Sequence, residues 1–82
     1  MNTHELKCWP QYYEPVESGM KPFEIRQNDR GFQVGDKLVL REWVLEDYCP
    51  DTGYYTGREC TLTITYMTDF YQATGYVVLG VR

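Results

Sequence analysis

The sequence has little of what metal-binding and disulfide-bonded proteins need. Its 82 residues include one histidine and three cysteines, and no cysteine stands in a Cys-x-x-Cys pair or at a zinc-ligand spacing from His4. We therefore expect no metal. Because Cys8, Cys49 and Cys60 cannot all pair within one chain, we predict reduced thiols and an intracellular, cytoplasmic setting.

Long apolar runs are also absent. No stretch is long enough to span a bilayer, and residues 1–7 do not resemble a secretory signal, so no contact with a membrane is expected. The chain contains no repeat, low-complexity tract or linker. Its length suits one domain, which we predict to cover residues 1–82, without a cofactor.

An excess of positive charge is the third feature that is missing. The net charge is −4, which argues against broad, charge-driven binding to nucleic acid. The charges are unevenly spread, however. Residues 42–82 hold two basic against six acidic side chains, whereas residues 19–41 hold five basic against three acidic ones. Recognition of an anion is therefore expected only locally, around residues 18–31.

Aromatic residues are plentiful, with eight Tyr, three Phe and two Trp. Each buried ring removes roughly 150–250 Å² from water, so a few of them can build the core of a small domain. Pro10 and Gly19 bracket a short helix that Pro15 must shorten or kink. Residues 46–57, "EDYCPDTGYYTG", are predicted to form a loop or hairpin tip.

Alternating apolar residues predict the strands. The predicted strands span residues 3–9, 21–27, 37–45, 58–68 and 76–82. The 37–45 strand is so apolar that burial of both faces is expected, and Cys60, Leu62, Ile64 and Tyr66 are predicted to share one face. The fold class is mainly β (α+β): five to six mostly antiparallel strands, one short N-terminal helix, and closure into a small barrel that hides the strand edges.

The segment "SGMKPFEIRQNDRG", residues 18–31, concentrates the charge. Glu24 and Arg26 share a strand face, roughly 6.5–7 Å apart, and a turn after Gly19 can bring Lys21 back toward them. Two cations would then flank one carboxylate, an arrangement suited to phosphate or to polar base edges. The alternative is a pair on the solvent face of an ordinary strand, contributing at most about 1 kcal/mol.

Other residues could extend such a site. Trp9 shares a face of the first strand with Lys7 and is a candidate stacking platform for a base. Trp43 is a second candidate platform or a core residue, and the tyrosines at 54 and 55 could stack on a ligand or simply occupy a turn. His4 is either a general acid or base, or a solvated residue near the terminus.

The stretch "GMKPFEIR", Gly19 to Arg26, matches the Gly-x-Lys-x-x-Glu-x-Arg signature of the ASCH domain, a member of the PUA-like superfamily. It lies between the first helix and the next strand, as in that family. The segment "VGDKLVL" resembles the family's Gly-Asp turn. The segments "HELKCWPQYY" and "GYVVLGV" are similar to an uncharacterised bacterial and phage group within the family.

The resemblance implies a PUA-like β-barrel with a cleft beside the helix. Its first functional implication is a module that binds RNA, a nucleotide or a modified base. Glu24 would floor the cleft, and Lys21 and Arg26 would take phosphate or carbonyl oxygens. The expected rim contacts are Lys7, Trp9 and Arg30.

Two other functions stay open. One is a metal-independent hydrolase, a ribonuclease or an amidohydrolase of modified nucleosides, with Lys21 stabilising charge and Glu24 as acid or base. The amidohydrolases carry a pattern that resembles Lys-Thr-x-Thr-x-Arg, but Pro22 and Glu24 replace its two threonines here. The other is a protein contact or homodimer formed by the acidic second half and residues 46–57.

Overall fold

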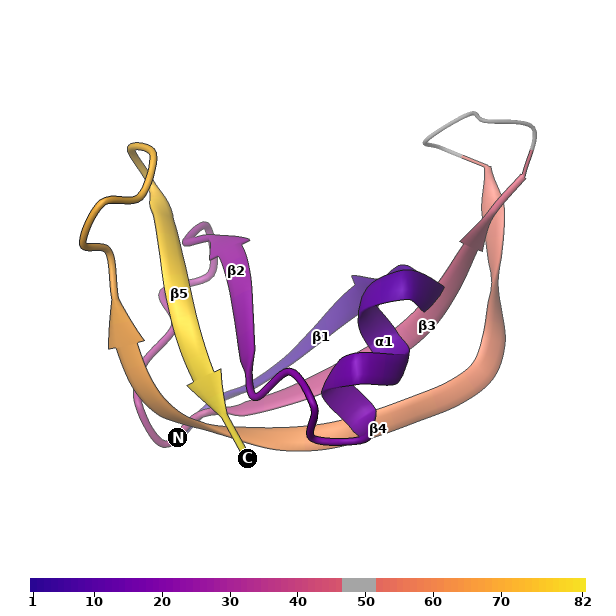
Figure 1. The fold of residues 1–82 in the computed structure, drawn as a ribbon, viewed down its shortest axis with the longest axis horizontal. Coiled ribbons are helices and arrows are strands. Elements are labelled where there is room, and N and C mark those ends of the chain that lie inside the picture. Colours follow the sequence, from indigo (N-terminus) through magenta and orange to yellow (C-terminus); the bar gives the residue numbers. More distant parts are fainter. Residues whose placement is uncertain (47–51) are drawn as a thin grey trace.

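The computed structural model describes residues 1–46 and 52–82. Figure 1 shows its helix and five strands. In chain order they are β1 (Thr3–Cys8), α1 (Pro10–Glu17), β2 (Phe23–Gln27), β3 (Lys37–Leu45), β4 (Gly53–Thr68) and β5 (Tyr76–Val81). The predicted helix and the five predicted strands are confirmed. The start of β4 at Gly53 is a correction, because Tyr54 and Tyr55 belong to that strand and not to a hairpin tip. Cys49 lies outside the described residues.

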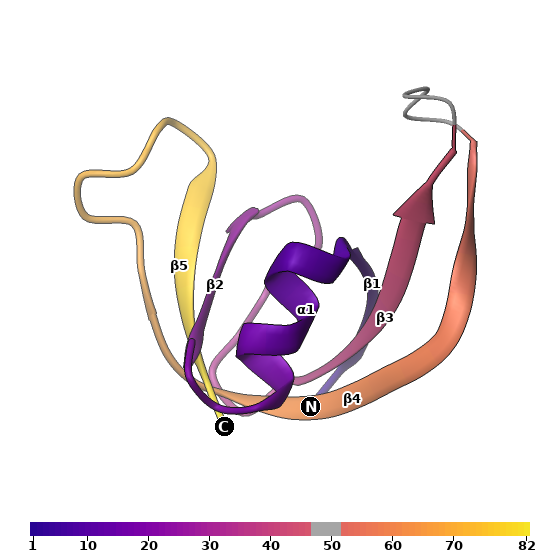
Figure 2. The same cartoon turned by 45° about the vertical axis from the view of Figure 1, so that its right-hand side comes forward.

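The strands form one mixed sheet in the order β1-β3-β4-β5-β2. Strands β1 and β3 are parallel, and the other three pairings are antiparallel. The long β4 runs through both halves of the sheet, which curves into a U around α1 (Figures 1 and 2). Because β1 and β2 pair on one side only, the sheet does not close, and the predicted barrel is not confirmed.

The core lies inside this U. Strand β1 alternates as predicted, with its even-numbered residues buried. From α1, Tyr13 and Val16 reach the core, whereas Tyr12 is about half exposed. The buried apolar side chains are Leu6, Cys8, Tyr13, Val16, Phe32, Leu38, Leu40, Ile64, Val77, Leu79 and Val81.

Strand β2 presents its charged face to the interior. Glu24 is 4% exposed, whereas Phe23 and Ile25 are 38% and 51% exposed. The antiparallel register explains this arrangement, because Glu24 pairs with the fully buried Leu79 of β5 and so shares its inward-facing side. The interpretation of Glu24 as part of a solvent face is therefore wrong.

Two further expectations about strand faces need correction. Strand β3 buries Leu38, Leu40 and Glu42 on one face, while the residues of its other face are half-buried or exposed. In β4, the register shifts between Ile64 and Tyr66. This irregularity turns Tyr66 outward, to 64% exposure, and Met67 packs against the core in its place. Tyr66 therefore does not share the face of Ile64.

A buried hydrogen-bonded pair, His4 and Asp36, fixes the turn before β3 to the start of β1. Asp36 accepts hydrogen bonds from the backbone N–H of Asn2 at 3.0 Å and of Gln33 at 3.1 Å, and the His4 Nε2 lies 2.9 Å from its Oδ2. These bonds, that of Asn2 foremost and then that of His4, lower the pKa of Asp36. His4 packs edge-on against Phe32 and is 8% exposed, so the expectation of a solvated histidine is wrong.

Candidate functional site

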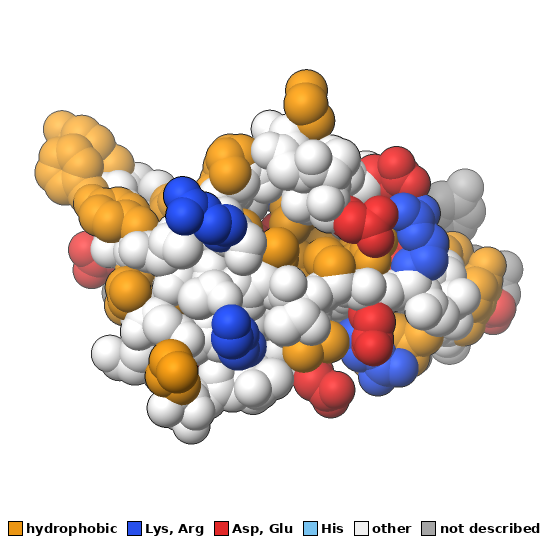
Figure 3. Space-filling model, turned by 90° about the horizontal axis from the view of Figure 1, so that it is seen from below, with side chains coloured by type: hydrophobic (Ala, Val, Ile, Leu, Met, Phe, Trp, Pro, Cys, Tyr) orange, Lys and Arg blue, Asp and Glu red, His pale blue; other side chains and the backbone are white. Residues whose placement is uncertain are grey.

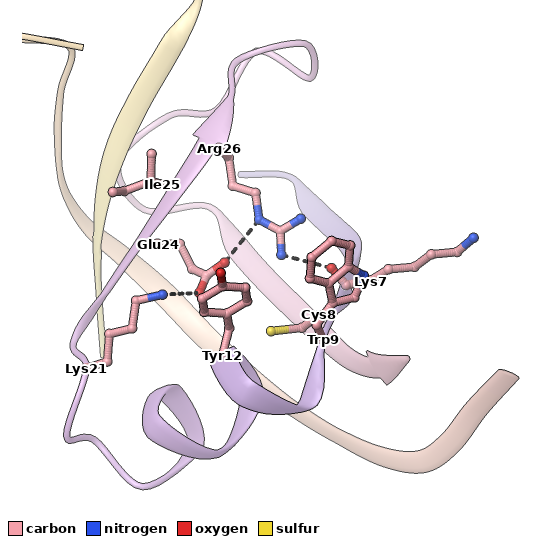
Figure 4. A pocket seen from close by; sticks show the side chains of 8 residues that line it. All are labelled: Lys7, Cys8, Trp9, Tyr12, Lys21, Glu24, Ile25 and Arg26. Atoms are coloured by element: carbon pink, nitrogen blue, oxygen red, sulfur yellow. Dashed lines mark hydrogen bonds and ion pairs between the residues drawn. The ribbon is translucent and has the colours of Figure 1, made fainter. Parts of the chain in front are cut away.

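A cleft of about 500 Å³ opens between α1, the end of β1 and β2 (Figure 4). Its lining comes from three separate parts of the sequence. The lining residues are Lys7, Cys8, Trp9, Tyr12, Lys21, Glu24, Ile25 and Arg26. The cleft therefore lies between the two edge strands of the open sheet, at the place where closure of a barrel would have been expected.

The turn after α1 delivers Lys21 to this cleft. Gly19 adopts a positive φ of 84°, a conformation that side-chain-bearing residues rarely adopt. The backbone N–H of Gly19 then bonds the Val16 carbonyl, and that of Lys21 bonds the Pro15 carbonyl at 2.9 Å. The chain thus folds back over the helix end. The positive φ of this turn explains why the signature has a glycine at position 19.

The structure brings the three charged head groups of the signature together. Arg26 donates from Nε to Glu24 Oε2 at 3.0 Å, and the Lys21 Nζ lies 3.6 Å from Glu24 Oε1 (Figure 4). The cationic side chains are 24% and 25% exposed, and that of Glu24 is 5% exposed. Two positive charges and one negative charge leave the cluster with a formal charge of +1.

Arg26 also joins the two edges of the sheet. Its Nη2 donates a hydrogen bond of 2.9 Å to the carbonyl oxygen of Lys7, at the end of β1. Arg26 therefore donates one hydrogen bond from Nε to Glu24 and another from a terminal nitrogen to the facing strand β1. This side-chain bridge spans β1 and β2 where no backbone ladder does. It fixes the guanidinium plane across the cleft.

Glu24 Oε1 is a buried acceptor without a hydrogen bond. Its ion-pair distance of 3.6 Å to Lys21 exceeds hydrogen-bond length. Leaving a buried acceptor unpaired costs about 1–3 kcal/mol, so such atoms are rare in native proteins unless they have a function. The oxygen faces the Lys21 ammonium at the cleft wall (Figure 4). A donor N–H or O–H of a ligand in the cleft would complete its bonding.

Aromatic rings form one wall of the cleft. Trp9 and Tyr12 are 43% and 48% exposed, and their rings stack with centroids 6.3 Å apart at an angle of 25°. The Lys21 ammonium lies 4.9 Å from the Tyr12 ring. Sequence reasoning missed Tyr12 as a site residue, because helical spacing did not indicate which of Tyr12 and Tyr13 faces the core.

Cys8 lies on the cleft wall beside the acidic group. Burial raises the pKa of its thiol to about 11, and the negative charge of Glu24 adds to the increase. The thiol is therefore protonated at neutral pH, and it does not supply a thiolate nucleophile. The small apolar Cys8 and the exposed Ile25 were also missed as lining residues, since neither carries a recognisable binding chemistry.

Two of the predicted rim residues take other positions. Lys7 contributes its backbone to the cleft, but its ammonium points away, 4.0 Å from the Trp43 ring (Figure 4). Arg30 is exposed, pairs with Asp29 at 4.0 Å and is not part of the cleft lining. Trp9 lies at the rim, as the sequence suggested, although it precedes α1 as its N-cap and does not belong to β1.

The molecular surface carries charge of both signs. On the face seen in Figure 3, basic and acidic side chains lie against each other at one end, and hydrophobic side chains protrude at the end that carries the β4–β5 connection. Phe70 and Tyr71 of that connection are 72% and 92% exposed. The basic side chains on this face do not gather into one large patch (Figure 3).

Within residues 1–46 and 52–82, no group of three His, Cys, Asp or Glu side chains is arranged to hold a metal ion. The helix in the same part of the chain is too short and too polar to cross a membrane.

The sequence is similar to a described family and to a phage protein. A family model described as a domain of unknown function (DUF3850) matches residues 3–81. The chain is also 39% identical over 66 residues to the uncharacterized 12.9 kDa protein in GpA 3'region of Escherichia phage P2. That match covers 80% of the chain and 54% of the phage protein, so the chain spans about half the length of this relative.

Proposed function

The chain belongs to the family described as a domain of unknown function (DUF3850), and we propose that it binds RNA, a nucleotide or a modified base in the cleft of Lys21, Glu24 and Arg26. The observation that carries this proposal is Glu24 Oε1, a buried acceptor without a hydrogen bond on the cleft floor. A base supplies a planar ring with N–H donors on its edge, and one of these donors could form the hydrogen bond that Glu24 Oε1 does not have.

Each cleft residue has a role in this proposal. Glu24 accepts a hydrogen bond from an amino or imino group of the base. Arg26, already fixed by Glu24 and by the Lys7 carbonyl, directs its remaining N–H groups toward a carbonyl or phosphate oxygen. Lys21 balances the carboxylate and adds positive charge. Trp9 and Tyr12 offer ring faces against which a base can stack.

The sequence signature supports the same proposal. Gly19, Lys21, Glu24 and Arg26 match the ASCH pattern, and we infer on this basis that the family falls within the PUA-like superfamily. The open sheet would then correspond to a PUA-like barrel whose seam between β1 and β2 is spanned by Arg26 instead of by a backbone ladder. Association of that superfamily with RNA and modified nucleotides favours the ligand class named above.

A thermal-shift screen of nucleosides, nucleotides and short RNAs tests the proposal. A ligand that binds only the folded chain raises the unfolding temperature, and the increase grows with the ratio of the ligand concentration to its dissociation constant. We expect at least one member of the panel to stabilise the wild-type chain, with a modest dependence on salt. The Lys21→Ala/Arg26→Ala double variant should lose this stabilisation. A double variant that binds as well as the wild type would contradict the proposal.

Hydrolysis is the second candidate, and the same oxygen favours it. A carboxylate oxygen that has no hydrogen bond and lies in a cleft can accept a proton from an attacking water. The contacts of Glu24 with both Arg26 and Lys21 favour binding more strongly, because the paired carboxylate is already stabilised. Turnover of RNA oligomers or acylated nucleosides that disappears in Glu24→Gln would establish the enzyme. Turnover that survives this substitution would exclude Glu24 as its acid or base.

A further inference from the structure

Two aromatic rings in contact, each with a cation over it, lie on the outer face of β1, β3 and β4. The Lys7 Nζ lies 4.0 Å from the Trp43 ring centroid, and Trp43 meets Tyr55 edge-on at 4.8 Å. The Arg41 guanidinium lies 4.0 Å from the Tyr55 ring. We call these four residues, Lys7, Trp43, Tyr55 and Arg41, the aromatic ladder.

The sheet register builds this ladder. Lys7 pairs with Arg41 across β1 and β3, and Trp43 pairs with Tyr55 across β3 and β4. The neighbouring row of Leu6 and Leu40 is buried, so the ladder faces the opposite side. The side chains of the ladder therefore come from three strands and meet on one surface.

Gly53 fixes the position of the indole. A Cβ at this position would come within 2.7 Å of the Trp43 ring and within 2.4 Å of the Val44 carbonyl oxygen. Only the absence of a side chain lets the ring lie this close to β4. The platform is therefore held by backbone packing, as a preformed stacking surface requires.

The composition of the ladder suits a single-stranded nucleic acid. Bases stack on ring faces, and here a cation covers one face of each ring. A base that stacks there would displace the cation, which would then neutralise a neighbouring phosphate. Tyr55 is 39% exposed and Trp43 is half-buried, so both rings are partly accessible. Glu59 pairs with Arg41 at 3.6 Å and is itself exposed, so a phosphate would compete with this carboxylate for the guanidinium.

Lys7 connects the ladder to the cleft. Its carbonyl oxygen accepts the hydrogen bond of Arg26 inside the cleft, while its ammonium lies on Trp43 outside (Figure 4). Strand β1 is an edge of the sheet, so no neighbouring strand separates the two surfaces at this point. We propose that a single-stranded RNA whose base occupies the cleft continues over the edge of β1 onto the aromatic ladder. This inference rests on the proposed function and selects an RNA strand over a free nucleotide.

The experiment compares ligand length in the wild-type chain. Fluorescence anisotropy measures binding of a labelled RNA hexanucleotide of random sequence, and competition with it measures the four nucleoside monophosphates. Stacking on an additional ring strengthens binding by about tenfold, so we expect the hexanucleotide to bind about tenfold more tightly than the best monophosphate. In the wild type, the indole N–H resonance of Trp43 should shift with the hexanucleotide and stay unchanged with the monophosphate.

Variants of Tyr55 test the ladder itself. Tyr55→Ala should weaken binding of the hexanucleotide about fivefold or more and leave the monophosphate affinity unchanged, whereas Tyr55→Phe, which keeps the ring, should bind like the wild type. Tyr66→Ala is the matched control, because this exposed tyrosine lies in β4 beyond the register shift and outside the ladder. Both ligands should bind it normally.

Two results would overturn the inference in different ways. A hexanucleotide that binds no more tightly than a monophosphate, without a shift of Trp43, would remove the ladder and leave the cleft as the proposed site. Absence of binding by both ligands would overturn the proposed function and the ladder together. The Trp43 resonance decides the question in the wild-type chain, even if a variant at Tyr55 fails to fold.

Discussion

Two of the buried carboxylates among the described residues, Asp36 and Glu24, differ in their partners. Asp36 is 2% exposed and Glu24 is 4% exposed. Both oxygens of Asp36 are engaged, Oδ1 with the backbone N–H of Asn2 and Oδ2 with His4 and the backbone N–H of Gln33. Glu24 has one hydrogen bond, from Arg26 to Oε2, and its Oε1 has none.

The difference separates a structural group from a functional one. Removing a fully bonded buried carboxylate leaves several donors without partners, so its loss damages the fold. An incompletely bonded carboxylate weakens the folded state slightly in exchange for an acceptor that a ligand can use. Glu24 also lies in a cleft with two stacked rings, whereas Asp36 lies beneath a turn. Burial alone therefore does not identify a site, whereas a buried acceptor that lies in a cleft without a hydrogen bond points to one.

The largest expected effect is on stability at Asp36. Asp36→Ala leaves the N–H groups of Asn2 and Gln33 and the His4 ring without an acceptor, and should lower the unfolding midpoint by about 10 °C or more. Thermal unfolding followed by circular dichroism measures it. Glu24→Gln keeps the shape of the side chain and an acceptor for Arg26, so its midpoint should change by only about 4 °C or less. Equal losses in the two variants would remove the distinction between these carboxylates.

The second effect is on ligand binding, where a substitution of Glu24 should cost more than one of Asp36. Glu24→Gln replaces a charged acceptor by a neutral amide and should weaken binding of the ligand found in the thermal-shift screen by about tenfold or more. Binding measured by isothermal titration calorimetry checks this. Asp36→Asn, where enough of it is folded, should bind that ligand within about threefold of the wild type. A stronger loss at Asp36 than at Glu24 would contradict the assignment.

A smaller effect is expected in the pH dependence of stability. The pKa of Asp36 is lowered in the folded chain from its ordinary value of 3.8. Its stabilising contribution is therefore complete above the ordinary value and is lost as the pH falls through the lower, folded-state value. Urea unfolding between about pH 6 and about pH 3 should show a shallower acid-side decline in Asp36→Asn than in the wild type. Parallel curves would contradict the role of Asp36.

The smallest expected effect concerns Cys8. Burial and then the charge of Glu24 raise the pKa of its thiol to about 11. In a Cys49→Ser/Cys60→Ser background, Cys8 should react slowly with a disulfide reagent at pH 8, and Glu24→Gln should accelerate this reaction by lowering the pKa. Stopped-flow absorbance measures the rate. An unchanged rate would mean that Glu24 does not influence the thiol across the cleft.

The secondary structure could be predicted from the sequence, but the buried face of β2 could not. Alternation separates Phe23 and Ile25 from Glu24 and Arg26, and it does not reveal which pair points inward. Hydrophobicity suggests that Phe23 and Ile25 point inward. Glu24 points inward instead, because it pairs with the buried Leu79 of β5. That information lies in contacts between distant segments, which no local pattern contains.

The candidate site could be predicted from the sequence only in part, because some of its parts also depend on contacts between distant segments. The spacing of Lys21, Glu24 and Arg26 predicted that their charges converge, and the geometry agrees. Only Trp9 of the aromatic wall was predicted, because Tyr12 becomes part of it only through the position of α1 inside the curved sheet. The role of the Lys7 carbonyl was also hidden, since backbone atoms leave no signal in side-chain patterns.

The most direct test is a nuclear magnetic resonance titration that follows the side-chain carboxyl carbon of Glu24 as nucleosides and short RNAs are added. If Oε1 accepts a ligand hydrogen bond, this resonance and the Arg26 Nε–H resonance should shift together and saturate with at least one member of the panel. Carboxyl and guanidinium resonances that stay fixed throughout the panel, in a folded chain, would contradict the account.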